Sequence, residues 1–405
     1  MKMKAIALKQ YAEEKFKLSH YTSRQRDGRG EEVEVKTGVI FEGIAYQPTL
    51  GIRSMLGMDH WMRTAEAHTV LGRGGKTGLA MSDTLMLEAA GTWEMEGLRE
   101  ANRNVYQVLR RDGGLTVSLS SGKEARLGVV DGSWMGGHWM SAFVCLGEGL
   151  TVGIDIEGYR TRGNELAASR TILTRTAALL GKGFVSHVLA DALYGNREDF
   201  KLGMELEYHL VVKMEEEGEN TMGPIVWAKE LFSGVKRASD AKELGVECAE
   251  GTDAVRNIRY EVMIVKGVEW NVKKGEVICL TVAYVVEEHL KGKYAGQTFK
   301  YWVVTTDQSL TAVEMRDLGH TRWRIENNLF KELNELVGSK RAYIKDEKAK
   351  QALMLMWFFG WSLWQSYLLA MKKVIDRLSE GVKRTKSWYR RLFSIGKLRI
   401  AIDTA

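Results

Sequence analysis

Cysteine, proline and histidine are all scarce in this chain, and each scarcity argues against a class of protein. The cysteines, Cys145, Cys248 and Cys279, are odd in number and widely spaced, so neither a disulfide framework nor a zinc site is indicated and a reducing compartment is expected. The eight histidines show no metal-ligand spacing. There are two prolines, so the 42 glycines are expected to make most of the turns.

Charge is abundant but nearly balanced. The 58 basic residues exceed the 52 acidic residues by a net charge of +6, which suits a nucleic-acid partner without requiring one. Hydrophobic residues make up 45% and charged residues 27% of the chain, which are ordinary values for a globular protein. A chain of 405 residues can bury a large core and is expected to hold two or three structural units.

Residues 352–371 form the one long run without a charge. The run has the length of a membrane-spanning helix. It contains Ser362, Gln365 and Ser366, however, and a helix that is apolar all round can equally lie in a protein core. We favour the core helix and keep a membrane-attached protein as the alternative. No apolar segment follows the N-terminal lysines, so no secretion signal is expected.

The N-terminal part of the chain changes character at residue 51. Residues 1–50 are polar and predict an extended arm, whereas residues 51–114 follow a helical pattern in which Ser82 is a suitable N-cap. The helical segment could be a DNA-binding unit or a packing subdomain. The motif GRGGKT at 72–77 resembles a P-loop, but Val70 stands where the first glycine is required, and nucleotide binding is therefore rejected.

A series of short apolar segments predicts the core. Glycine turns separate the first strands, and a helix precedes the fifth, which indicates a mixed α/β sheet flanked by helices. The region after residue 213 is rich in β-forming residues and predicts a β-rich insertion domain at 214–300. The predicted strands are 115–119, 125–130, 139–145, 150–156, 185–190, 208–213, 259–265, 277–286 and 298–305, and the predicted helix is 165–180.

Three acidic residues stand at the ends of such segments. The apolar runs RLGVVDGS and FVSHVLADALYGN deliver Asp131 and Asp191, and an amphipathic helix predicted over 320–340 carries Glu326 one turn after Arg322. Three carboxylates without thiols or histidines suit Mg²⁺ or Mn²⁺. A pair of such ions can activate a nucleophile and stabilise a leaving oxygen in phosphoryl transfer.

Two alternatives remain open at this point. An Arg–Glu pair at helical spacing is also common on ordinary helix surfaces. Asp155 and Glu157 likewise follow a predicted strand and are alternative acids.

The motifs, taken in order, resemble those of the DDE transposases of bacterial insertion sequences, in particular insertion-sequence family four. VVDGS, GNELAASRTIL and VLADALYG are followed, after a long insertion, by YWVVTTD and HTRWRIEN, and the resemblance covers roughly residues 50–370. It implies an RNase H-like mixed-sheet catalytic core at 115–213 and 301–371. The β-rich insertion at 214–300 would interrupt this core, with a helical N-terminal subdomain at 51–114 and a basic tail at 372–405.

The resemblance also implies a function, that of a cut-and-paste DNA transposase. Asp131, Asp191 and Glu326 would be catalytic ligands of two Mg²⁺ or Mn²⁺ ions, and Arg322 would orient Glu326 or a phosphate. Trp302 would stack on a base flipped out of the DNA, with a place in the core as the alternative. The implied DNA-binding residues are Trp302, Arg322, Arg324 and Lys331.

The implied partners are double-stranded DNA, as terminal inverted repeats and target, and a second copy of the chain in a synaptic homodimer. No membrane partner is expected, and the expected location is the bacterial cytoplasm, at the nucleoid. Two positions depart from the family signature: its tyrosine is Gly319 here and its lysine is Leu333, with Lys331 the nearest basic residue. The alternative function is therefore a catalytically inactive, transposase-derived DNA-binding protein.

Overall fold

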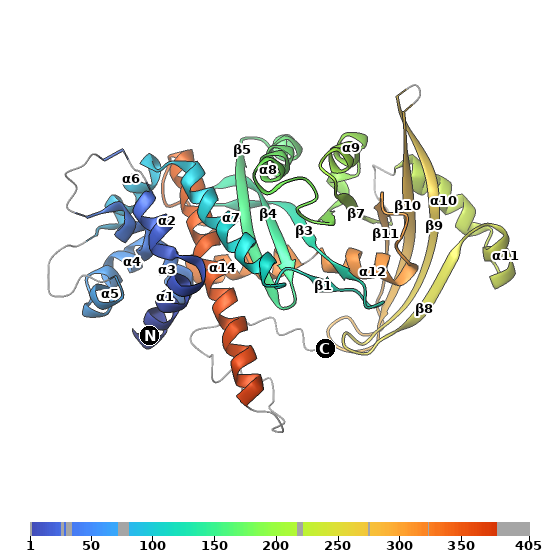
Figure 1. Ribbon diagram of the computed structural model, residues 1–405. Helices are drawn as coiled ribbons and strands as arrows, with labels where there is room; N and C mark the ends of the chain where they lie inside the picture. The colour runs from blue at the N-terminus through green and yellow to red at the C-terminus, as the bar shows by residue number, and fades with distance from the viewer. Residues whose placement is uncertain are drawn as a thin grey trace. The chain divides into compact units, whose positions relative to one another are not determined.

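The structure is a computed structural model that describes residues 2–25, 28–29, 35–71, 81–216, 222–273, 276–322 and 324–378. The chain divides into two compact units (Figure 1). Unit 1 consists of the described residues within 1–115, 132–176 and 324–378, and unit 2 consists of those within 116–131 and 177–323. The GRGGKT motif and the part of the basic tail after residue 378 lie outside the described residues.

Three helices occupy most of the described residues up to position 50, so the extended arm predicted for 1–50 is wrong outside residues 1, 26–27 and 30–34, which lie outside the described residues. They form α1 (Lys2–Phe16), α2 (Leu18–Arg24) and α3 (Thr37–Leu50). The apolar residues of α1 recur every three or four positions and are buried, which is the pattern of an amphipathic helix. The lysines and glutamates between these positions make the segment polar on average, so its composition does not reveal the apolar stripe. Its members are Ala5, Leu8, Ala12 and Phe16.

The helical pattern from residue 51 onward is present in the structure. The Ser82 hydroxyl accepts a hydrogen bond from the backbone N–H of Leu85 at 3.1 Å, so the predicted N-cap is confirmed. The helices of this region are α4 (Met55–Met62), α5 (Ala65–Val70), α6 (Asp83–Thr92) and α7 (Met95–Arg111).

The uncharged run lies in α14 (Glu347–Leu378), which packs against α3, α6, α7 and β5 (Leu150–Tyr159) inside unit 1 (Figure 1). Trp357, Phe358 and Trp361 are fully buried. A side chain at Gly360 would place its Cβ 1.8 Å from the Ala45 carbonyl of α3, so this helix crossing requires glycine. Among the described residues, no helix combines the length and apolar character needed to cross a membrane. The run is a core helix.

Unit 1 contains three neighbouring strands in the order β5-β4-β3. The later part of β3 (Leu127–Met135) turns into β4 (His138–Gly147) through Gly136 and Gly137, whose φ angles are 60° and 73°. A two-residue turn with both φ angles positive matches the right-handed twist of a hairpin. β4 and β5 are antiparallel.

Unit 2 contains a large mixed sheet, in the order β3-β6-β7-β11-β10-β9-β8. β3, β6 and β7 are parallel, and the strands that follow are antiparallel. The strands are β6 (His187–Ala190), β7 (His209–Glu215), β8 (Glu247–Asp253), β9 (Ile258–Lys273), β10 (Glu276–His289) and β11 (Thr298–Thr305); β1 (Val117–Ser118) pairs separately with β2 (Glu124–Ala125). The helices are α9 (Arg197–Glu205), α10 (Gly223–Ser233), α11 (Ala238–Glu243) and α12 (Ala312–Thr321); α8 (Glu165–Leu180), at the predicted position, leads from unit 1 into unit 2.

The segment predicted as an insertion domain joins this sheet. β8, β9 and β10 continue the sheet through β11, which pairs with β7, and the long β9 and β10 are conspicuous in Figure 1. The segment also contains the two helices α10 and α11, which the β-rich composition did not indicate.

The helix predicted over 320–340 is interrupted. α12 ends at Thr321, a π-helical segment, η3, spans Ile325–Phe330, and α13 covers Lys331–Val337. The predicted apolar stripe is correct, since all of its members are buried, but the continuous α-helix is not. The stripe consists of Ile325, Leu329, Leu333, Leu336 and Val337.

Candidate functional site

Asp131 and Asp191 lie at the same level of two neighbouring parallel strands. The register of β3 and β6 ends with Val129 opposite Leu189. Each aspartate stands two residues further along its chain segment. Residues in step on parallel strands point to the same face, and neighbouring strands are about 4.8 Å apart. The backbone therefore directs both carboxylates to one place in unit 2. Asp131 is still within β3, whereas Asp191 directly follows β6.

The two carboxylates have different surroundings. Asp131 is 8% exposed, and its Oδ2 lies 3.4 Å from Nη1 of Arg322, which follows α12. Asp191 is half-buried and accepts the backbone N–H of Leu193 at 2.9 Å, so it caps the short turn after β6. Arg322 was expected to orient Glu326 or a phosphate. In the structure Arg322 lies beside Asp131.

Glu326 is exposed, in the first turn of the π-helical segment, and belongs to unit 1. π-Helical turns inside helices are frequent at functional sites. In the part of the chain that the structure describes, no three or more His, Cys, Asp or Glu side chains are placed together to hold a metal ion. Of the three predicted ligands, Asp131 and Asp191 stand in step just beyond the paired ends of neighbouring parallel strands of unit 2.

The aspartate pair fits a hard divalent cation. Mg²⁺ is commonly held by one or two carboxylates together with waters and substrate phosphates. Asp131 and Asp191 supply such a carboxylate set, and no thiol is needed. The guanidinium of Arg322 adds a planar cation beside Asp131 that suits a phosphate.

Trp302 lies in the core of unit 2. It is 4% exposed on β11, an interior strand between β7 and β10. Its ring stacks on Phe232 at a centroid distance of 6.0 Å and contacts Tyr284 at 4.7 Å. Both neighbours cover the ring, so Trp302 occupies the core position given as the alternative, and base stacking stays a prediction.

The other two predicted DNA contacts differ in their surroundings. Arg324 donates from Nη2 to the carbonyls of Gly147 at 2.9 Å and Leu150 at 3.3 Å, so it holds the β4–β5 turn. Lys331 is exposed. Lys331 therefore stays accessible to a ligand, whereas Arg324 already has a structural task.

Packing accounts for both departures from the signature. A Cβ at Gly319 of α12 would lie 2.7 Å from Val303 Cγ2 and 3.2 Å from the Tyr301 ring on β11, which leaves no room for a tyrosine. Leu333 is fully buried in α13, where a lysine charge would be costly.

The alternative acids Asp155 and Glu157 are neutralised by arginines. Asp155 accepts Nε of Arg99 at 3.0 Å and Nε of Arg175 at 2.7 Å. Glu157 accepts Nη1 of Arg175 at 2.9 Å. With two guanidinium groups bound to them, these acids form a structural ion-pair cluster of unit 1 rather than a metal site.

The sequence did not predict a histidine–aspartate pair, because its two residues are far apart in the chain. His187 Nε2 lies 3.0 Å from Asp307 Oδ2, and His187 Nδ1 lies 3.0 Å from Ser186 Oγ. Burial alone would raise the pKa of Asp307, but hydrogen bonds from His187 and Ser309 hold it well below its usual range. The Ser186 hydroxyl bonds both the N–H and the carbonyl of Arg126. Its ties to the backbone give it a structural role rather than that of a nucleophile.

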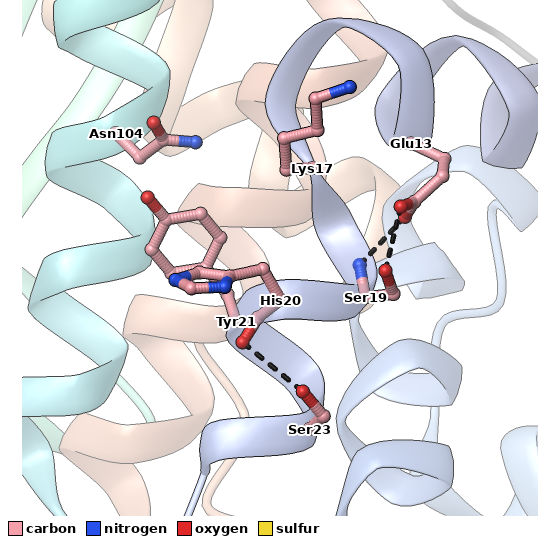
Figure 2. A pocket seen from close by; sticks show the side chains of 7 residues that line it. All are labelled: Glu13, Lys17, Ser19, His20, Tyr21, Ser23 and Asn104. Atoms are coloured by element: carbon pink, nitrogen blue, oxygen red, sulfur yellow. Dashed lines mark hydrogen bonds between the residues drawn. The ribbon is translucent and has the colours of Figure 1, made fainter.

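A hollow in unit 1 lies between α1, α2 and α7 (Figure 2). Glu13 accepts the N–H and the hydroxyl of Ser19, each at 2.7 Å, which fixes the α1–α2 corner where Lys17 has a φ of 56°. Its lining contains a single carboxylate and no acid–base pair around a nucleophile, so no catalytic role is assigned to it. The lining residues are Glu13, Lys17, Ser19, His20, Tyr21, Ser23 and Asn104.

Comparison with known proteins gives a distant structural likeness. No protein-family model and no curated protein sequence matches the chain. Among solved structures, the chain is similar to one described as the piggyBac transposase synaptic complex with hairpin DNA, with 9% identity over 98% of this chain and 86% of that chain, and a TM-score of 0.38. A similarity of this size establishes neither a shared fold nor a shared activity.

Proposed function

We propose that the chain is a DNA transposase of the DDE type, which binds the terminal inverted repeats of its element and performs metal-dependent cleavage and strand transfer. The observation that carries the proposal is that Asp131 and Asp191 each stand two residues beyond Val129 and Leu189, the last pair of the parallel strands β3 and β6. Carboxylates at the ends of neighbouring strands are a common way to hold the divalent cations used in phosphoryl transfer. The RWRIEN motif adds Glu326 as the third acid.

Each residue has a separate task in this proposal. Asp131, Asp191 and Glu326 would hold two Mg²⁺ or Mn²⁺ ions; when bound, such ions favour the attacking hydroxide or 3′-hydroxyl and stabilise the leaving oxygen. The N–H of Leu193 keeps the Asp191 carboxylate oriented. Arg322, beside Asp131, would take a phosphate of the DNA backbone in a bidentate contact.

The order of elements supports an RNase H-like core. Unit 1 contributes the order β5-β4-β3, and unit 2 contributes β3-β6-β7 with β6 and β7 parallel to β3. Hairpin strands followed by a helix and then a strand parallel to the first agree with that plan. Double-stranded DNA and a second copy of the chain in a synaptic complex belong to the same proposal.

The test is cleavage of a labelled duplex that carries the terminal repeat of the element, with Mg²⁺ or Mn²⁺. Asp131→Asn, Asp191→Asn and Glu326→Gln are each expected to abolish cutting and to leave binding of the repeat intact. Glu243→Gln, at an exposed acid of α11, is the matched control and should cut like the wild type. Wild-type cutting by any of the first three variants would remove that acid from the site.

The second candidate is an inactive, transposase-derived DNA-binding protein. The contact between Arg322 and Asp131 favours it, because it ties up one carboxylate, and so do Gly319 and Leu333 in place of the signature residues. This candidate predicts binding of the repeat by the wild type without cutting in either metal.

A further inference from the structure

Three aromatic side chains form a row across the strands of unit 1. Trp139 on β4 stands directly opposite Tyr159 on β5, and their rings stack at 6.2 Å with 18° between their planes. The two-residue turn at Gly136 and Gly137 places Trp134 of β3 opposite Trp139. The Trp134 and Trp139 rings meet edge to face at 5.3 Å. Such cross-strand aromatic pairs fix one another's orientation.

The row runs from a buried end to an exposed end. Tyr159 is buried, and its hydroxyl donates to Glu165 at 3.0 Å, which anchors that end. Trp139 is half-buried. Trp134 is 42% exposed, so a large part of its surface is open to solvent while its neighbours hold it in place.

A basic segment lies beside the exposed end. The N–H of Gly136 donates to the Ser339 carbonyl at 2.6 Å, and a Cβ at Gly137 would lie only 2.5 Å from Ala342 Cβ, so the hairpin turn is packed on the segment 339–350. The acids of this segment are Asp346, whose carboxylate caps α14 by accepting the N–H of Ala349, and Glu347. Its basic residues, which outnumber them, are Lys340, Arg341, Lys345, Lys348 and Lys350.

We propose that Trp134 and the basic segment 339–350 form a binding platform for single-stranded DNA. An unpaired base stacks on the open face of Trp134, and neighbouring phosphates contact the lysines and the arginine. Aromatic rings beside basic side chains are the general means by which proteins hold single strands, whereas a protein-docking patch does not require the positive rim. The platform rests on the proposed function in that DNA is the substrate.

The platform is distinct from the aspartate pair. Side chains alternate along a strand, so Trp134 points to the opposite face of β3 from Asp131. Three residues of extended chain, about 10 Å, separate their positions along the strand. Trp134 can therefore be changed without altering either proposed metal ligand.

The test measures binding of a single-stranded oligonucleotide that carries 2-aminopurine, and of the matching duplex, to full-length variants. Trp134→Ala is expected to weaken single-strand binding about 5- to 100-fold, because stacking on an aromatic contributes that much per base. Trp134→Phe should recover most of the affinity and the fluorescence quenching. Trp227→Ala, at a tryptophan 48% exposed on α10, is the control and should bind like the wild type.

A second set of variants tests the basic segment 339–350. Lys340→Gln and Arg341→Gln should each lower the salt dependence of single-strand binding by about 0.7 in the logarithmic slope. The platform would be overturned if Trp134→Ala bound the single strand as tightly as the wild type, with both proteins folded by circular dichroism. A change in self-association without a change in DNA binding would overturn it in favour of a protein contact.

The platform and the proposed function can be refuted independently of each other. Asp131→Asn is expected to keep the single-strand affinity even though it stops cutting. If the wild type shows no metal-dependent cutting while Trp134→Ala still weakens single-strand binding, the transposase proposal fails and the platform stands. If cutting depends on the acids but single-strand binding ignores Trp134, the platform alone is refuted.

Discussion

Glu332 on α13 is a buried acid whose replacement should stabilise unit 1. The side chain is 8% exposed, and its Oε2 accepts Nε1 of Trp361 and Nε2 of Gln365, each at 3.0 Å. Burial raises the pKa of Glu332 to about 8 from the ordinary 4.5, and the nearby charge of Glu335 acts in the same direction. The folded protein therefore holds this carboxyl protonated at neutral pH.

The sign and size of the effect follow from the two pKa values. Below pH 4.5 the carboxyl is protonated in the folded and the unfolded chain, and its full contribution to stability is present. As the pH rises toward 8 the unfolded chain ionises first, so stability is lost at up to about 1.4 kcal/mol per pH unit. The total loss is at most roughly 5 kcal/mol. Glu332→Gln keeps an acceptor for Trp361 and removes the ionisation.

The assay is denaturant unfolding at several pH values between 5 and 8, followed by tryptophan fluorescence. The Glu332→Gln protein should match the wild type closely at pH 5 and exceed it in unfolding free energy by several kcal/mol at pH 8, by the linkage above. Glu335→Gln, on the same helix but less buried, is the control and should show a much smaller trend. A stability difference that does not change with pH would refute the reasoning.

Three further predictions concern unit 2. Trp302→Ala removes a buried ring and should lower the unfolding free energy by about 3–5 kcal/mol, measured by denaturant titration; a loss below about 1 kcal/mol would contradict the core assignment. Gly319→Ala brings a Cβ within 2.7 Å of Val303 and should cost about 1–3 kcal/mol in the same titration. Asp307, whose pKa is lowered in the folded state, contributes stability that is lost as pH falls below 4, so Asp307→Asn should flatten the acid limb of the unfolding profile.

Sequence patterns correctly predicted those helices and strands that are determined by neighbouring residues. The helix at 165–180 and the Ser82 cap appear where amphipathic spacing and capping chemistry place them. The apolar segments before Asp131 and Asp191 form strands, because such runs satisfy a sheet buried on both faces.

The features that the sequence did not predict depend on packing between residues that are far apart in the chain. The stripe of α1 is masked by the charges between its members, and the burial of Trp302 depends on Phe232 and Tyr284, which are distant in sequence. The contact of Arg322 with Asp131 likewise joins residues far apart in the chain. The π-helical segment at Ile325–Phe330 has no sequence signal that the helical pattern could reveal.

The central claim, that Asp131 and Asp191 form a divalent-metal site, is tested most directly by titrating the protein with Mn²⁺ and recording the free ion by electron paramagnetic resonance. The wild type and Glu243→Gln should bind Mn²⁺ alike, and Asp131→Asn and Asp191→Asn should each weaken binding by at least about tenfold, which is the loss of one charged ligand. Equal Mn²⁺ affinity in all four proteins would contradict the account.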